Sequence, residues 1–388
     1  MKGSTRLVLL LGALTAFGPV SMDTYLPGLP ELGRDLGASA SQAQLTLTAC
    51  LIGLATGQLL AGPVSDARGR RLPLLVGLAL FVAASVACAA APDIWTLTAA
   101  RLVQGVAGAA GIVIARAVVR DLYAGSEMAR FFAVLMLVNG LGPILAPVAG
   151  AQLLAVTSWR GIFLVLAGFG VVLLAAAAAG LRETLPPERR RGGGLVATWR
   201  VFRGLAADRD FAGYVLACGF AMAAMFAYIA GSPFVLQEIH GVSPTGFSVA
   251  FATNAGGIMA MGALSSRLVT RAGPARLLKA GLAVQTAGAA ALLASVLSGA
   301  GLAAVLVSLF AVVSSIGLVL PNATALALAD HPHTAGSASG LLGLAQFLFG
   351  AIAAPLVGIG GTGTAVPMAV VIAVAAAAAG VAAYSTAA

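Results

Sequence analysis

One carboxylate, Asp23, falls within an otherwise apolar stretch of the sequence, residues 17–27. A charged side chain at the centre of a bilayer costs at least about 2.5–3.5 kcal/mol on insertion scales, so an acid kept there is expected to serve a purpose. We interpret Asp23 as a proton-binding group that faces a water-filled cavity. The alternative is an acid at the outer end of a membrane span, hydrated among lipid headgroups.

A second charge, Arg101, lies a turn or two inside another apolar stretch. A guanidinium group stays protonated in proteins, so a buried arginine needs a partner or water. A charged Arg101 close to Asp23 would favour the carboxylate form of the acid, whereas burial would favour its neutral form. The alternative is an arginine whose side chain extends outward to the membrane interface.

Other chemistries find little support in the sequence. No Walker loop is present, which excludes ATP as the energy source, and no nucleophile stands with a base and a supporting acid. His331 and His333 lie beside Asp330, but two imidazoles on a polar turn are interpreted here as solvated side chains. We expect no enzyme activity, no cofactor and no metal site.

The composition of the chain indicates that Asp23 and Arg101 lie in membrane-spanning helices. Of the 388 residues, 60% are hydrophobic and 9% are charged, whereas soluble domains carry about 25% charged residues. Crossing a bilayer takes about 20 apolar residues per helix, and helices satisfy their own backbone groups in lipid. We predict an all-α membrane protein with twelve spans, near residues 6–28, 43–64, 73–91, 95–119, 130–155, 160–181, 211–236, 245–266, 275–297, 302–324, 337–358 and 365–384.

The net charge of +9 is interpreted as membrane topology rather than as nucleic-acid binding. Arginines concentrate in alternate loops, as basic residues do in the cytoplasmic loops of membrane proteins. We therefore expect both termini in the cytoplasm. The preference for Arg over Lys, with abundant Ala and Gly, is typical of GC-rich bacterial genomes, so the expected location is a bacterial inner membrane.

A polar stretch at residues 182–210 divides six spans from six. We predict an N-terminal six-helix bundle at 1–181, a cytoplasmic linker at 182–210 and a C-terminal bundle at 211–388. A shift of 200 residues brings weak similarities into register, as expected for two parallel halves related by an axis along the membrane normal. This arrangement predicts a monomeric secondary transporter with a central cavity between the two bundles.

The loop after the second span has a distinctive spacing of Gly62, Asp66, Gly69 and Arg70. In this position it resembles the signature loop of the major facilitator superfamily. The resemblance implies a latch, in which the glycines permit a tight turn and Asp66 pairs with Arg70 and sits against the start of span eleven, near Ser337. The alternative is an ordinary solvated basic turn that sets topology.

Two further segments resemble motifs of the same superfamily. Arg101 stands before a Gln-Gly pair in a pattern whose arginine is tied to proton coupling in the family. The fifth span resembles the antiporter motif found in exporters, a Gly/Pro-rich helix represented here by Gly140, Pro143, Pro147 and Gly150. Small residues let helices touch closely, and prolines remove donors and bend the helix. The alternative is generic small-residue packing.

Further runs, at 22–30, 116–123, 159–163 and 183–185, are similar to the bicyclomycin/chloramphenicol-resistance (Bcr/CflA) subfamily. That resemblance implies proton-driven export of amphipathic drugs by alternating access. The alternatives are proton-coupled export of an endogenous metabolite or amino acid, and a non-transporting membrane sensor. Uptake by proton symport is disfavoured by the antiporter motif.

A drug-sized substrate needs a mostly apolar cavity with a few polar groups that orient it. The expected partners are a small drug-like molecule, protons and the lipid bilayer. The candidate lining residues are Tyr25, Gln44, Tyr228, Ser232, Asn254, Asn322 and Gln346. The alternative is that some of these polar side chains bridge helices instead of lining a cavity.

Overall fold

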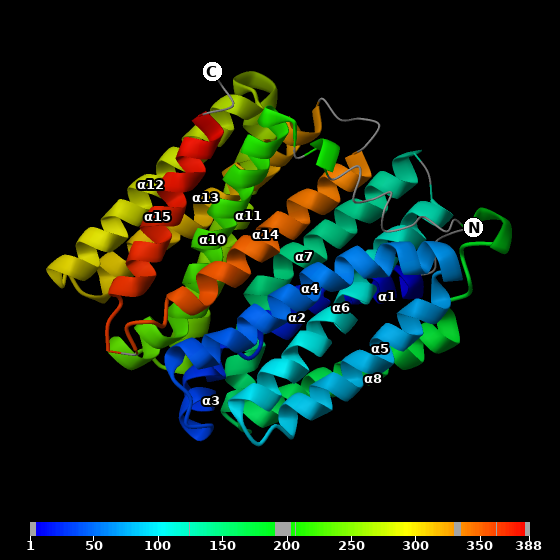
Figure 1. Ribbon diagram of the computed structural model, residues 1–388, viewed down its shortest axis with the longest axis horizontal. Helices are drawn as coiled ribbons and strands as arrows, with labels where there is room; N and C mark the ends of the chain where they lie inside the picture. Colours follow the sequence, from blue (N-terminus) through cyan, green and yellow to red (C-terminus); the bar gives the residue numbers. More distant parts are fainter. Residues whose placement is uncertain are drawn as a thin grey trace. The chain divides into compact units, whose positions relative to one another are not determined.

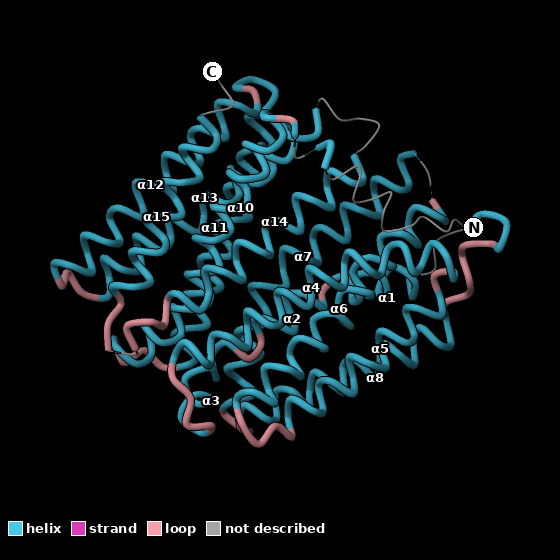
Figure 2. The backbone as a smooth tube through the Cα atoms, viewed as in Figure 1, coloured by secondary structure: helices cyan, strands magenta, loops and turns pink. Residues whose placement is uncertain are grey.

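The computed structural model describes residues 5–123, 125–190, 203–205, 207–329, 335–361 and 363–384. Within these ranges the chain forms helices joined by short loops, and no residue is in a β-strand (Figure 1, Figure 2). The all-α class predicted from the apolar stretches is confirmed.

The first predicted span is a broken series of short helices rather than one rod. It comprises α1 (Thr5–Thr15), α2 (Phe17–Asp23), the 3-10 turn η1 (Leu26–Gly28) and α3 (Leu29–Asp35). The axis bends by 46° between α1 and the following segment. Proline lacks a backbone N–H and clashes with the preceding turn, so Pro19 near the start of α2 and Pro27 within η1 account for breaks at these places.

Five long helices follow in the first half of the sequence. They are α4 (Ala40–Arg68), α5 (Arg71–Ala89), α6 (Ile94–Leu122), α7 (Gly125–Leu154) and α8 (Trp159–Gly180), after which comes the short turn η2 (Pro187–Arg189). The side chain of Asp93 caps α6 by accepting hydrogen bonds from the backbone N–H groups of Trp95 and Thr96. Such a cap satisfies donors that the helix itself cannot pair.

The second half of the sequence contains a matching set of long helices. They are α10 (Arg209–Phe234), continued by the π-helix η3 (Val235–Ile239), then α11 (Pro244–Ala272), α12 (Pro274–Ser298), α13 (Leu302–Ala329), α14 (Ala335–Leu356) and α15 (Val366–Tyr384). Side chains of Asp208 and Ser243 cap α10 and α11.

Among the described residues, ten helices are long and apolar enough to cross a membrane, and the bent first series brings the number to eleven. The remaining predicted stretch, 130–155, falls on α7, where Leu141–Leu154 counts as a shorter apolar helix. Each of the twelve predicted stretches therefore coincides with a helical segment. The chief difference is the first span, which is bent and continues to Asp35.

The chain divides into two compact units, Met1–Gly28 with Ala49–Leu195, and Leu29–Thr48 with Val196–Ala388. In the first unit α5 packs along α6 and α8, and α2 packs against α7. In the second, α10 packs against α13, α14 and α15 around a core that includes Phe211, Leu282 and Val319. Much of the predicted linker at 182–210 lies outside the described residues, so the predicted domain boundaries stay a prediction.

Candidate functional site

Asp23 is the last residue of α2, just before the chain continues into the 3-10 turn η1. Its side chain is buried, with 6% of its surface exposed. Hydroxyl groups around it satisfy backbone carbonyls of the short helix. Ser21 Oγ donates to Phe17 O at 2.6 Å, and Thr24 Oγ1 donates to Val20 O at 2.6 Å. The acid thus lies at a helix end where hydroxyl groups bond back to backbone carbonyls, an arrangement that often bends a helix.

Arg101 projects from α6 and is fully buried, with 0% of its surface exposed. Its Nη1 donates to Ser21 O at 3.0 Å and to Gln104 Oε1 at 2.5 Å. Gln104 Nε2 in turn donates to Ser85 Oγ at 2.7 Å. A chain of polar contacts therefore runs from α2 through α6 to α5, inside the first unit.

Aromatic rings cover the remaining face of the Arg101 guanidinium. Its Cζ lies 4.4 Å from the centroid of the Tyr25 ring and 5.6 Å from that of Phe163. The Nε and Nη2 atoms donate to no acceptor in the part of the chain that the structure describes. A cation placed over an aromatic face is attracted by the ring's quadrupole, and more so when water is excluded. The rings thus partly offset the loss of water around this charge.

Asp23 and Arg101 do not form a salt bridge. The ion pairs found among the described residues join other partners, and Arg101 contacts the backbone two residues before the acid instead. The arginine therefore fixes the segment that carries Asp23 without neutralising its carboxylate.

Helix α7, which carries the predicted antiporter motif, packs tightly on α2. A Cβ atom added to Gly150 would lie 1.8 Å from Thr24 O, and one added to Gly142 would lie 2.7 Å from the Pro19 Cβ. Both distances are shorter than real Cβ contacts, so only glycine allows this approach. Pro143 and Pro147 lie inside α7. Gly140 is also on α7, but the packing around it is not among the described features.

The predicted latch loop forms a polar network around Arg70. Arg70 Nη1 contacts Asp66 Oδ1 at 2.5 Å, and its Nε contacts Asp121 Oδ2 at 2.8 Å. Nη1 also donates to Ser65 Oγ at 2.8 Å. Gly69 has a φ of +91°, a conformation that glycine adopts without steric cost. Contact of Asp66 with Ser337 stays a prediction, because the Ser337 side chain is not described.

Glu183 is a member of this network that the sequence reasoning did not assign. Its carboxylate accepts backbone N–H groups of Arg70 at 2.8 Å and Arg71 at 3.2 Å, at the start of α5. It also accepts from Thr184 and Leu185. Partial burial opposes ionisation of Glu183, but these four donors outweigh it and hold the pKa of the carboxyl below its usual value. In the sequence, residues 183–185 carry only the resemblance to the subfamily.

The cavity candidates in the second half are mostly buried between helices. Asn254 Nδ2 donates to Tyr228 Oη at 2.9 Å, which joins α11 to α10. Asn322 Nδ2 donates to Ser265 Oγ at 2.8 Å. Ser232 is fully buried, and its Oγ has no hydrogen-bond partner within the described segments. Gln346 is half-buried on α14. Their predicted role in lining a substrate cavity stays a prediction.

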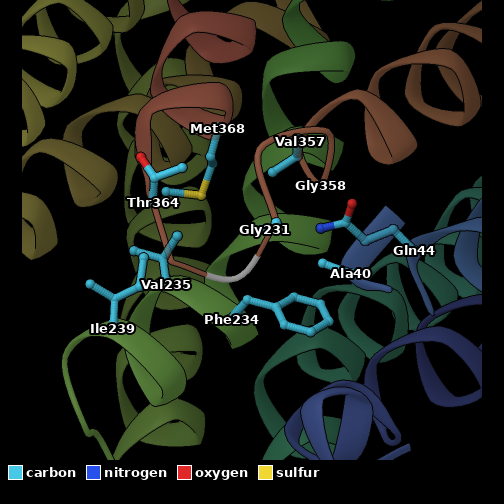
Figure 3. A pocket seen from close by; sticks show the side chains of 11 residues that line it. Ala40, Gln44, Gly231, Phe234, Val235, Ile239, Val357, Gly358, Thr364 and Met368 are labelled. Atoms are coloured by element: carbon cyan, nitrogen blue, oxygen red, sulfur yellow. The ribbon is translucent and has the colours of Figure 1, made fainter. Parts of the chain in front are cut away.

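Gln44 lies on α4 at the edge of a small cavity in the second unit (Figure 3). Its Nε2 donates to Ala230 O at 3.1 Å, while its Oε1 meets no donor among the described residues. The cavity volume is about 10 Å³, close to the minimum that holds one water molecule. Gly231, Gly358 and Met368 form part of its wall.

Comparison with known proteins places this architecture in a family. Residues 9–355 match the model of the Major Facilitator Superfamily. The chain is 42% identical over 370 residues to an uncharacterized MFS-type transporter, YdgK, of Bacillus subtilis, covering 94% of this chain and 92% of the relative. It is 30% identical over 367 residues to a bicyclomycin resistance protein homolog of Haemophilus influenzae, covering 95% and 92%.

A solved structure shows the same fold. A bacterial homolog of the human lysosomal transporter Spinster, in an inward-facing and unoccupied conformation, superposes with a TM-score of 0.78 over 98% of both chains, at 16% identity. With its apolar helices and these relatives, the chain is a multi-pass membrane transporter and not an enzyme. It belongs to the Major Facilitator Superfamily.

Proposed function

We propose that this protein exports amphipathic drugs in exchange for protons, as a member of the Bcr/CflA group of bacterial inner-membrane antiporters with both termini in the cytoplasm. The observation that carries the proposal is the position of Asp23. The buried acid ends the short helix α2, seven residues after the 46° bend of a discontinuous first span. Secondary transporters commonly build ion and substrate sites from broken helices near the bilayer midplane.

The charged groups around Asp23 support a proton as the coupling species. The nearby cation, Arg101, is engaged by Ser21 O and Gln104, and among the described residues no ion pair involves Asp23. A carboxylate in that position is stabilised when it takes up a proton.

The cycle follows from competition at one site. When the site opens to the more acidic side, Asp23 takes up a proton as the drug leaves. When it opens to the cytoplasm, the proton departs and a new drug molecule binds. Because each ligand favours a different protonation state of Asp23, the two move in opposite directions. No cofactor takes part, and the proton gradient supplies the energy.

The drug class is supported by the bicyclomycin resistance homolog, which aligns over most of this chain. Chloramphenicol-type and bicyclomycin-type antibiotics are therefore the first substrates to examine. Cells that express the protein should gain resistance to members of this panel, and a protonophore should abolish the gain. Resistance that persists under the protonophore would contradict proton coupling.

A transport assay tests the role of Asp23 directly. Everted vesicles that contain the protein should accumulate drug when a pH gradient is imposed. Asp23→Asn, which cannot ionise, should abolish that accumulation while the protein stays folded. Asp93→Asn is the matched control, because Asp93 is an exposed helix cap and asparagine caps equally well. Coupled transport retained by Asp23→Asn would contradict the assignment.

The same vesicles separate the remaining alternatives. A proton flux that responds to amino acids or other metabolites, but to none of the drugs, would identify an exporter of an endogenous compound. A protein that moves no solute at all, in either the native or the Asp23→Asn form, would instead fit a membrane sensor.

A further inference from the structure

An apolar groove runs along the first unit, between α4 and α5 and over α6. Its volume is about 240 Å³. The walls include Leu60 and Val64 of α4, and Leu72 and Val76 of α5, all of them exposed. Ala107 and Ala110 of α6 form the floor. None of the candidate coupling or cavity residues lines it, so the groove lies outside the transport site.

Glycines create the groove by bringing both wall helices close to α6. A Cβ on Gly57 of α4 would lie 2.5 Å from Val106 O, and a Cβ on Gly77 of α5 would lie 2.7 Å from the Ala110 Cβ. Each wall helix thus touches α6 at a small residue. The large side chains of α4 and α5 stand to either side, and the space between them stays open.

One end of the groove carries a positive charge. Arg68, the last residue of α4, is exposed and lines the groove. It forms no salt bridge with any described residue. Its neighbour Arg70 differs, because Arg70 is buried and engaged by Asp66 and Asp121. The charge of Asp66 is thereby balanced, and Arg68 remains available to an anion.

The length of the groove matches one leaflet of a bilayer. From Gly57 to Arg68 the helix advances 11 residues, or about 16 Å at 1.5 Å per residue. Half of the hydrocarbon core measures about 15 Å. A fatty acyl chain that starts at the arginine end would therefore reach the middle of the membrane at the far end of the groove.

We propose that this groove binds one anionic phospholipid, with an acyl chain between α4 and α5 and its phosphate on Arg68. The apolar walls exclude a polar ligand from most of the groove, and the single cation selects a negative headgroup. Arginine pairs well with phosphate because its N–H donors match the phosphate oxygens. The site places a lipid directly beside the loop that holds Asp66 and Arg70.

Native mass spectrometry of the full-length purified protein tests this proposal. The protein is delipidated in mild detergent and mixed with equal amounts of phosphatidylglycerol and phosphatidylethanolamine that carry the same acyl chains. The native protein should retain one phosphatidylglycerol in preference to phosphatidylethanolamine. Arg68→Gln should reduce that preference about fivefold, the effect expected for one arginine near a lipid phosphate. Arg120→Gln, an exposed arginine that does not line the groove, should leave it unchanged.

A second pair of variants tests the acyl chain. Ala61→Phe fills the groove from α4 and should lower retention of both lipids, whereas Ala175→Phe on an exposed face of α8 should not. Equal lipid preference in the native and Arg68→Gln proteins would overturn the proposal. So would displacement of the lipid by soluble glycerol phosphate, which would indicate a site for free phosphate. A change in dimer content with Ala61→Phe, at constant lipid retention, would show that a second copy of the chain occupies the groove.

Discussion

Arg101 donates a hydrogen bond to the backbone carbonyl of Ser21 at 3.0 Å, and Ser21 stands two residues before Asp23. The cation on α6 and the acid on α2 are therefore linked through the main chain rather than by a salt bridge. A direct ion pair would stabilise the carboxylate against protonation. The observed contact instead joins Arg101 to the backbone of α2, and no ion pair between Arg101 and Asp23 is found among the described residues.

Two substitutions of Arg101 should show whether transport depends on its positive charge or on the hydrogen bonds of its planar guanidinium group. Arg101→Ala removes the donor to Ser21 O and Gln104 and leaves those buried acceptors unpaired, at a cost of about 1–3 kcal/mol each. Drug accumulation driven by a pH gradient should be lost. Arg101→Lys keeps a cation near Tyr25 but not the planar fork, so it should restore part of the transport. Full transport by the alanine variant would contradict this role.

Gly150→Ala should destabilise the contact between α7 and α2. The added methyl would lie 1.8 Å from Thr24 O, so the helices must separate, which typically costs about 1–3 kcal/mol. The thermal unfolding temperature of the protein in detergent should fall. Gly168→Ala is the control, because Gly168 lies within α8 with open space around it. It should raise stability slightly, since alanine favours helix by up to about 1 kcal/mol over glycine.

Glu183→Gln should weaken the loop network in a pH-dependent way. The pKa of Glu183 in the folded protein is lowered from its usual 4.5, so its ionised form stabilises the fold above that pH. This contribution is lost as the pH falls through the lowered pKa. At neutral pH the glutamine variant should therefore unfold at a lower temperature than the native protein, and the difference should shrink as the medium becomes acidic. Glu188→Gln, at an exposed position, should show no such pattern.

Tyr228→Phe tests whether the contact between α10 and α11 is structural or serves the substrate. The change removes the acceptor of the Asn254 amide and leaves a buried donor unpaired, at a cost of about 1–3 kcal/mol. Lower thermal stability with an unchanged ranking of transported drugs would assign the pair to helix bridging. An altered ranking of drugs at unchanged stability would place Tyr228 in the substrate cavity.

The sequence predicted the helical class and the position of each apolar stretch, because length and hydropathy follow directly from bilayer thickness. The break in the first span was not predicted, although the sequence contains Pro19 and Pro27. Hydropathy gives the length of an apolar run, but it does not show whether the helix axis changes direction within that run. The spacing of Asp66 and Arg70 indicated a local pair of the kind that the structure contains.

The partners of Arg70 from distant segments could not be predicted. Asp121 and Glu183 reach it from more than 50 residues away in the sequence, and one sequence carries no information about such contacts. The requirement for glycine at position 150 could not be predicted either, because it arises from the close approach of the Thr24 carbonyl. Composition identified the elements, whereas the contacts among them required three-dimensional coordinates.

The hydrogen bonds from the backbone N–H groups of Arg70 and Arg71 to Glu183 also fix the chain just after α8. The segment that follows α8 is therefore attached to the start of α5. Glu183 thus ties the C-terminal side of α8 to the start of α5, next to the turn at Gly69, so that a shift of either helix end is transmitted to the other.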